Sequence, residues 1–101
     1  MTDQRQDSFH KFMPETARIF QELMDATFKE GALTFQMKEL IAIGVAVSMG
    51  CDDCINHHVE TALQNGIAKE EIAEAMAVGF EMGVGRLYPP LRRAITGHFW
   101  E

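Results

Sequence analysis

Apolar residues recur at steps of three and four along almost the whole chain, and no segment alternates strictly between apolar and polar residues. A repeat near 3.6 residues indicates amphipathic α-helices, whereas strict alternation would indicate strands. The sequence therefore predicts an all-α fold, a small single-domain bundle of five to six helices over residues 1–101. Five of these helices have readable bounds, at about residues 14–29, 35–49, 50–65, 69–82 and 89–99.

The predicted helix 35–49 is apolar on nearly every face between Leu40 and Val47. A helix with this character is expected to be buried on all sides, either at the centre of a bundle or at a seam between subunits. A chain of 101 residues has only a modest core. We therefore expect part of this helix to be covered by other copies of the chain, in a homo-oligomer.

The charge of the chain excludes several classes of partner. Nine Lys and Arg residues face fifteen Asp and Glu residues, for a formal net charge of −6. Binding to nucleic acid or to anionic lipid would favour a basic surface, so neither partner is expected. No run reaches the roughly 18 to 20 apolar residues of a membrane span, and the N-terminus has no hydrophobic signal-peptide core. The sequence thus predicts a cytoplasmic protein.

The two cysteines of the chain, Cys51 and Cys54, lie three residues apart where the predicted third helix begins. In a reducing compartment such a pair is more typical of redox or metal chemistry than of a structural disulfide. Both sulfurs are expected near the unpaired N–H groups and the positive end of the helix, which favour the reactive thiolate. His58 follows Cys54 by one turn on the same predicted inward stripe, where its imidazole can exchange a proton with the thiol.

Glu39 lies twelve residues before Cys51 in the apolar helix. A carboxylate in such surroundings is costly unless it has a partner. If the two helices are antiparallel, Glu39 can face His58, which predicts a Glu–His–Cys proton relay with the second cysteine placed to close a disulfide.

Other interpretations remain open at this level. The cysteines can serve as small buried apolar residues, His58 as a hydrogen-bonded core histidine, and Glu39 as a carboxylate that favours a helix start. Zinc is a further alternative, with Cys51, Cys54 and His58 as ligands and Glu39 or His57 as the fourth. His57 falls on the polar face of its helix, where an ordinary surface position is the favoured interpretation and a role at a subunit interface is the alternative.

Glu39, eleven further residues, Cys51-Asp-Asp-Cys54 and His58 together resemble the E-x11-C-x-x-C-x3-H signature of AhpD-like proteins. These proteins belong to the alkylhydroperoxidase and carboxymuconolactone decarboxylase superfamily. The turn over residues 66–72, Gly-Ile-Ala-Lys-Glu-Glu-Ile, is similar to the family's link between helices, and the resemblance extends over about residues 35–83.

The resemblance implies an all-α fold assembled as trimers or hexamers and a thiol-based peroxidase or disulfide-exchange activity. By position, Cys54 corresponds to the cysteine that attacks the peroxide and Cys51 to the one that resolves it. Glu39 and His58 correspond to the proton-relay pair. An external dithiol is implied as reductant and a small hydroperoxide as substrate, with no flavin, haem or metal cofactor.

Asp53 departs from the pattern, because better-known peroxidase members have a histidine there. Together with Asp52 it sets two negative charges beside the thiols, which disfavours the thiolate and is expected to slow attack at neutral pH. The alternatives to a peroxidase are an acid–base enzyme similar to the decarboxylase branch, which generally lacks the cysteine pair, and a zinc-stabilised or oligomeric binding module.

Overall fold

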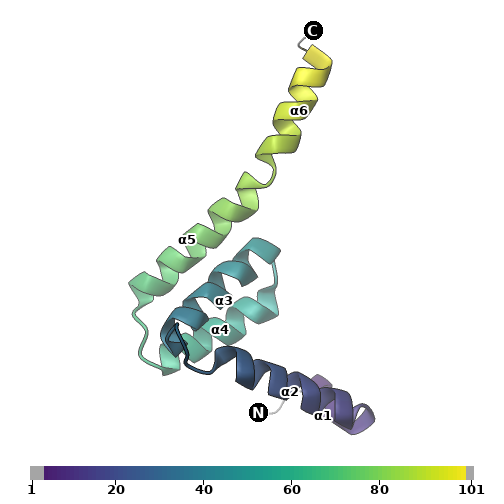
Figure 1. The fold of residues 1–101 in the computed structure, drawn as a ribbon, viewed down its shortest axis with the longest axis vertical. Helices are drawn as coiled ribbons and strands as arrows, with labels where there is room; N and C mark the ends of the chain where they lie inside the picture. Colours follow the sequence, from purple (N-terminus) through teal and green to yellow (C-terminus); the bar gives the residue numbers. More distant parts are fainter. Residues whose placement is uncertain (1–3, 100–101) are drawn as a thin grey trace. The chain divides into compact units, whose positions relative to one another are not determined.

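A computed structural model describes residues 4–99, which form six α-helices and no strand (Figure 1). The helices are α1 (Gln4–Phe12), α2 (Pro14–Phe28), α3 (Phe35–Met49), α4 (Asp52–Gln64), α5 (Lys69–Gly85) and α6 (Tyr88–Phe99). The predicted all-α class is therefore confirmed. None of the helices in this range combines the length and the apolar character needed to cross a lipid bilayer.

The chain divides into two compact units, Met1–Phe35 and Gln36–Glu101. The first unit contains α1 and α2, which only Met13 separates. Pro14 occupies the first turn of α2, where its missing N–H is not needed by the helix. Ala17 is the buried residue of α2.

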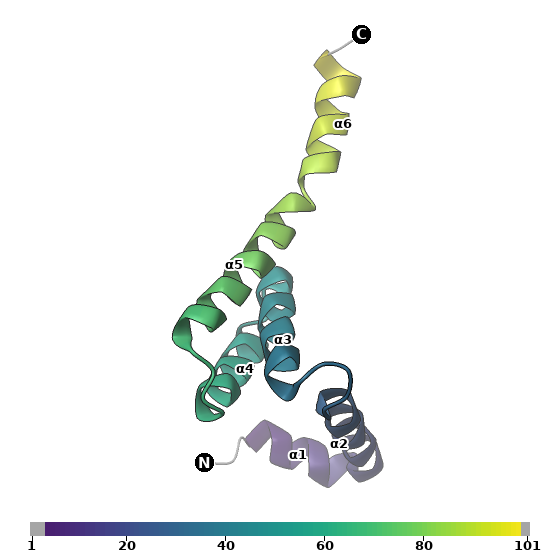
Figure 2. The ribbon, with the colours of Figure 1, turned by 60° about the vertical axis from the view of Figure 1, so that its left-hand side comes forward.

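The second unit is built on α3 and α4, which form an antiparallel pair (Figures 1 and 2). Gly50 links them with a φ of 68°, a conformation that side chains with a Cβ adopt only under strain. Gly66 has a φ of 78° and ends α4 in the same way before the chain enters α5. The two short turns keep the three helices in contact around one core.

The core of this unit draws on α3, α4, α5 and the α4–α5 link. Its buried residues are Ile43, Ala62, Ile67 and Ile72, with Leu40, Val59, Ala75 and Met76 packed against them. Helices α3 and α5 approach each other closely at Gly44 and Gly79, where a Cβ on Gly79 would collide with the backbone of Gly44.

Two apolar stripes stay exposed on the second unit. The α3 stripe consists of Met37, Ile41, Val45 and Met49, which are 49–70% exposed. The C-terminal stripe consists of Leu87, Leu91, Ile95 and Phe99, which are 45–79% exposed. In both views α6 continues beyond the end of α5, away from the α3–α4 pair (Figures 1 and 2). Both stripes repeat every four residues and so lie along one side of their helix.

The five helices expected from the sequence are all present, with three differences. Helix α1 was not among them, because its sequence is polar and has no apolar period. Helix α5 continues through Gly83-Val84-Gly85, beyond its predicted end at about residue 82, and α6 begins at Tyr88, just before its predicted start at about residue 89. Only Glu39, Ile43 and Ala46 of α3 are buried within the single chain, so α3 does not lie at the centre of a bundle, and its expected covering by other copies stays a prediction.

Candidate active site

The two cysteines stand at the start of α4 and form a disulfide, with their Cα atoms 5.3 Å apart. Cys51 is the N-cap residue of the helix, and its Sγ accepts a hydrogen bond from the backbone N–H of Cys54 at 3.3 Å. A serine or aspartate commonly plays this part at a helix start. Here a sulfur takes it, so one of the two disulfide sulfurs also satisfies an N–H group of the first turn that would otherwise be unpaired.

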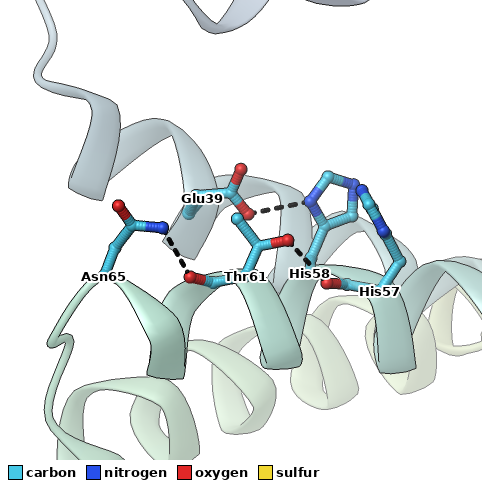
Figure 3. Close-up of polar contacts among 5 residues, drawn as sticks. All are labelled: Glu39, His57, His58, Thr61 and Asn65. Carbon is cyan, nitrogen blue, oxygen red and sulfur yellow. Dashed lines mark hydrogen bonds and ion pairs between the residues drawn. The ribbon is translucent and has the colours of Figure 1, made fainter.

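Glu39 and His58 form the polar contact between α3 and α4 (Figure 3). The Nδ1–H of His58 donates to Oε2 of Glu39 at 2.8 Å. Glu39 is buried, with 3% of its surface exposed, and its predicted need for a partner is met by this contact. With Nδ1 engaged, Nε2 is the nitrogen through which His58 can take up or release a proton.

The local sequence explains why these two side chains meet. Glu39, Ile43 and Ala46 recur at i, i+4 and i+7, so the carboxylate lies on the same face of α3 as the core residues. His58 and Ala62 have the corresponding four-residue spacing on α4. Because α3 and α4 are antiparallel, the two faces bring Glu39 opposite His58, as the sequence predicted.

His57 borders this pair on its exposed side. Its ring lies edge-on to that of His58, with centroids 4.9 Å apart and planes at 73°. The Thr61 hydroxyl donates to the His57 carbonyl at 2.9 Å, and the Asn65 side-chain amide donates to the Thr61 carbonyl at 2.8 Å (Figure 3). These two bonds reinforce the C-terminal half of α4. Sequence reasoning missed them, although Thr and Asn four residues apart on a polar face are the available signal.

The structure corrects the burial expected for the stripe of α4. Cys54 was expected to point inward, but it is exposed, whereas Cys51 is half-buried. Leu63 of the same stripe is also exposed. The reason is that α4 has core neighbours on only part of its expected inward face, around Val59 and Ala62. The cysteine nearer His58 in the sequence is therefore the more exposed of the two residues.

The zinc alternative finds no support in the geometry. Within residues 4–99, no three His, Cys, Asp or Glu side chains are arranged so that they could hold a metal ion. Asp52 and Asp53 occupy the first turn of α4, and both are exposed. A carboxylate there is favourable to the helix dipole, while it also sets negative charge beside the sulfurs.

Comparison with known proteins identifies the family of the chain. Residues 14–87 match the model of the carboxymuconolactone decarboxylase family. The chain belongs to this family. The match includes α2 to α5 and therefore all four residues of the expected signature, and the family resemblance drawn from the sequence is confirmed.

Two proteins similar to this chain are themselves uncharacterised. One, from Cupriavidus necator, is 42% identical over 72 residues, which cover 71% of this chain and 64% of that protein. The other is uncharacterised protein 4 of the cox locus of Paracoccus denitrificans, 38% identical over 77 residues, or 76% of this chain and 69% of that protein. The chain thus matches less than two-thirds of the length of the Cupriavidus relative.

Solved structures share the fold. A protein from Methanobacterium thermoautotrophicum superposes with a TM-score of 0.79 at 35% identity, over 85% of this chain and 97% of its own. A carboxymuconolactone decarboxylase family protein from Thermotoga maritima, with a suggested role in the antioxidative response, superposes with a TM-score of 0.64 at 34% identity, over 79% of this chain and 82% of its own. The expected AhpD-like all-α fold is confirmed.

Proposed function

We propose that this protein is a thiol-dependent oxidoreductase that reduces small hydroperoxides with Cys51 and Cys54. The observation that carries the proposal is the disulfide between these residues at the N-terminus of α4, one turn before a His58 that is held by buried Glu39. The suggested antioxidative role of the Thermotoga maritima relative agrees with it.

The cycle begins from the reduced pair. His58 takes the thiol proton of Cys54, and the thiolate attacks the distal oxygen of the hydroperoxide. A sulfur–oxygen bond forms, the oxygen–oxygen bond breaks, and the alkoxide leaves as an alcohol with the proton returned by His58. The products of this step are the alcohol and a sulfenic acid on Cys54.

The second cysteine closes the cycle. The Cys51 sulfur attacks the sulfenic sulfur, the disulfide forms, and hydroxide leaves as water with the Cys51 proton. An external dithiol then reduces the disulfide by two thiol–disulfide exchanges and is itself oxidised to a disulfide. Atoms and electrons balance, since one dithiol is consumed for each hydroperoxide reduced.

Exposure and proton transfer both support Cys54 as the attacking residue. Cys54 is the more exposed of the two cysteines, and side chains four residues apart on a helix are neighbours, which brings Cys54 within reach of His58. The hydrogen bond from the Cys54 N–H favours a thiolate on Cys51 instead. A general base contributes about 10²- to 10⁴-fold in rate, whereas charge at a helix terminus contributes about 0.3 to 1 kcal/mol. Cys54 is therefore assigned as the nucleophile, because contact with the base has the greater effect on the rate.

Glu39 has a positioning role in this scheme. Its carboxylate fixes Nδ1 of His58 as the protonated nitrogen and supports the imidazolium that forms when His58 takes the thiol proton. Asp52 and Asp53 act in the opposite sense on the thiols, because negative charge nearby disfavours the thiolate. We therefore expect slower attack than the same geometry would give without them.

A second candidate is an acid–base enzyme that acts on a carbon acid, as the family description indicates. The Glu39–His58 pair can serve a proton abstraction without either sulfur. The two functions differ in their need for cysteine, so a double Cys51→Ser, Cys54→Ser variant would keep the acid–base activity and lose the peroxidase activity.

The two exposed apolar stripes support assembly with further copies of the chain, as a trimer or hexamer. Surfaces of this kind are rare on soluble monomers, and each stripe runs along a helix that a neighbouring copy can cover. A reducing, cytoplasmic setting suits the proposed cycle, because the disulfide must be reduced after each turnover.

Thiol counting tests the proposal. The reduced protein is exposed to one equivalent of a small hydroperoxide, and its free thiols and the alcohol product are then measured. We expect two thiols to be lost for each alcohol formed, and an added dithiol to restore them. Retention of both thiols after peroxide would contradict the proposal and favour the acid–base alternative.

A further inference from the structure

A shallow pocket lies between the C-terminal end of α3 and the second half of α5. Its volume is about 250 Å³, and its lining comprises Val47, Ser48, Met49, Gly50, Gly79, Phe80, Gly83, Val84 and Arg86. Two of the four α5 residues in this lining are glycines, and because they have no side chain they leave space on that face of the helix. The Glu39–His58 chemistry described above uses none of these residues.

The chemical character of the lining is uneven. Val47, Met49, Phe80 and Val84 make it apolar, and Arg86 is its only charged residue. The Arg86 side chain forms no ion pair or hydrogen bond within the described part of the chain. An apolar hollow with one unpaired cation and no carboxylate is complementary to a molecule that carries a short hydrocarbon chain and one negative charge.

The chain connects this pocket directly to the redox pair. Gly50 lines the pocket and is the residue before Cys51. Adjacent Cα atoms lie about 3.8 Å apart, and those of Cys51 and Cys54 lie 5.3 Å apart, so Gly50 is within about 9 Å of Cys54. The Gly50 end of the pocket therefore lies close to the cysteine pair along the backbone.

We propose that this pocket binds short-chain carboxylates, with the hydrocarbon chain against Phe80 and Val84 and the carboxylate on Arg86. This inference rests on the proposed peroxidase function, and with it the preferred substrate is a hydroperoxide of a carboxylic acid of about six to ten carbons. The size follows from the volume of the pocket, which is smaller than the roughly 300–1,000 Å³ typical of sites for drug-sized ligands. The net charge of −6 repels anions in general, so such binding depends on the local cation.

The test measures binding without turnover, by calorimetric titration of the full chain with octanoate and with octan-1-ol. We expect octanoate to bind about three- to tenfold more tightly than octan-1-ol, the range for a charge-assisted contact at a partly exposed site. Arg86→Gln should remove this preference. The matched control is Arg92→Gln on exposed α6, outside the pocket lining, which should leave it unchanged.

A pocket-filling variant provides an independent check. A Cβ on Gly83 would lie 3.5 Å from the nearest Ser48 backbone atom, an ordinary contact, so Gly83→Ala adds a methyl group to the pocket wall without forcing the helices apart. We expect this variant to weaken both probes at least threefold while its circular dichroism stays that of the wild type.

The pocket and the peroxidase function can fail separately. Equal affinity for the two probes, an equal loss in Arg86→Gln and Arg92→Gln, or no saturable binding would overturn the pocket proposal. Octanoate binding with no loss of thiols to peroxide would instead keep the carboxylate site and remove the peroxidase function.

Discussion

The crossing of α3 and α5 offers a sharp test of the packing that holds the site. Substituting Gly79→Ala adds one methyl group where the backbones of the two helices meet. The new Cβ would approach the Gly44 Cα to 2.9 Å and the Gly44 carbonyl carbon to 2.8 Å. Ordinary contacts begin near 3.4 Å, and the obstructing atoms are all main chain, so no side chain can rotate away. The helices must move apart, and Glu39 is carried on one of them.

The expected cost follows from two opposing effects. Overpacking a close contact destabilises by about 1 to 3 kcal/mol, and more where the backbone must shift. Replacing a helical glycine with alanine stabilises the fold by roughly 0.5 to 1 kcal/mol, because alanine loses less conformational entropy on folding. We therefore expect a net loss of about 2 kcal/mol, which corresponds to a fall of roughly 8 to 16 °C in the melting temperature of a domain of this size.

Thermal unfolding followed by circular dichroism measures the effect, with Gly97→Ala as the matched control. A Cβ on Gly97 meets nothing within 4 Å, so only the entropy gain remains, and the control should melt slightly above the wild type. If Gly79→Ala also melts at or above the wild-type temperature, the close approach of α3 and α5 is not present in the protein.

Two further predictions concern the relay and the assembly. Glu39→Gln and His58→Ala should slow the formation of the sulfenic acid by about 10²- to 10⁴-fold without loss of helical content. Rapid mixing with peroxide measures this rate, and rates near wild type would show that both residues have only structural roles. Light scattering at micromolar concentration should give a multiple of the 11.4 kDa chain mass, and Leu91→Glu in the C-terminal stripe should lower it, whereas a wild-type mass near 11.4 kDa would exclude the oligomer.

Much of the helical framework could be predicted from the sequence, because apolar spacing and turn residues carry the signal. Gly66 ends α4 and Pro14 begins α2 as expected. Helix α5 passes through Gly83 unbroken. The sequence could not predict this, because a glycine that weakens an isolated helix also allows close packing, here against the Ser48 backbone.

The contact between the site residues could be predicted from the sequence, but the exposure of the cysteines could not. A buried carboxylate needs a partner, and antiparallel helices make His58 the available one, so the Glu39–His58 pair could be predicted. The exposure of Cys54 could not, because periodicity identifies a common face without showing how much of it has neighbours. The pocket beside Gly50 was missed for a similar reason, since it depends on two helices whose closeness only the fold reveals.

In the proposed cycle peroxide oxidises Cys54 and Cys51 resolves it, and chemical trapping of the sulfenic acid distinguishes the two cysteines. Reduced Cys51→Ser and Cys54→Ser variants are treated with one equivalent of hydroperoxide and a dimedone-type reagent, and the adduct is located by peptide mass spectrometry. We predict a labelled sulfenic acid on Cys54 in the Cys51→Ser variant and no label in the Cys54→Ser variant. Labelling of Cys51 would reverse the two roles and make the hydrogen bond at the start of α4 the dominant influence. An absence of label in both variants would contradict peroxide chemistry at this site.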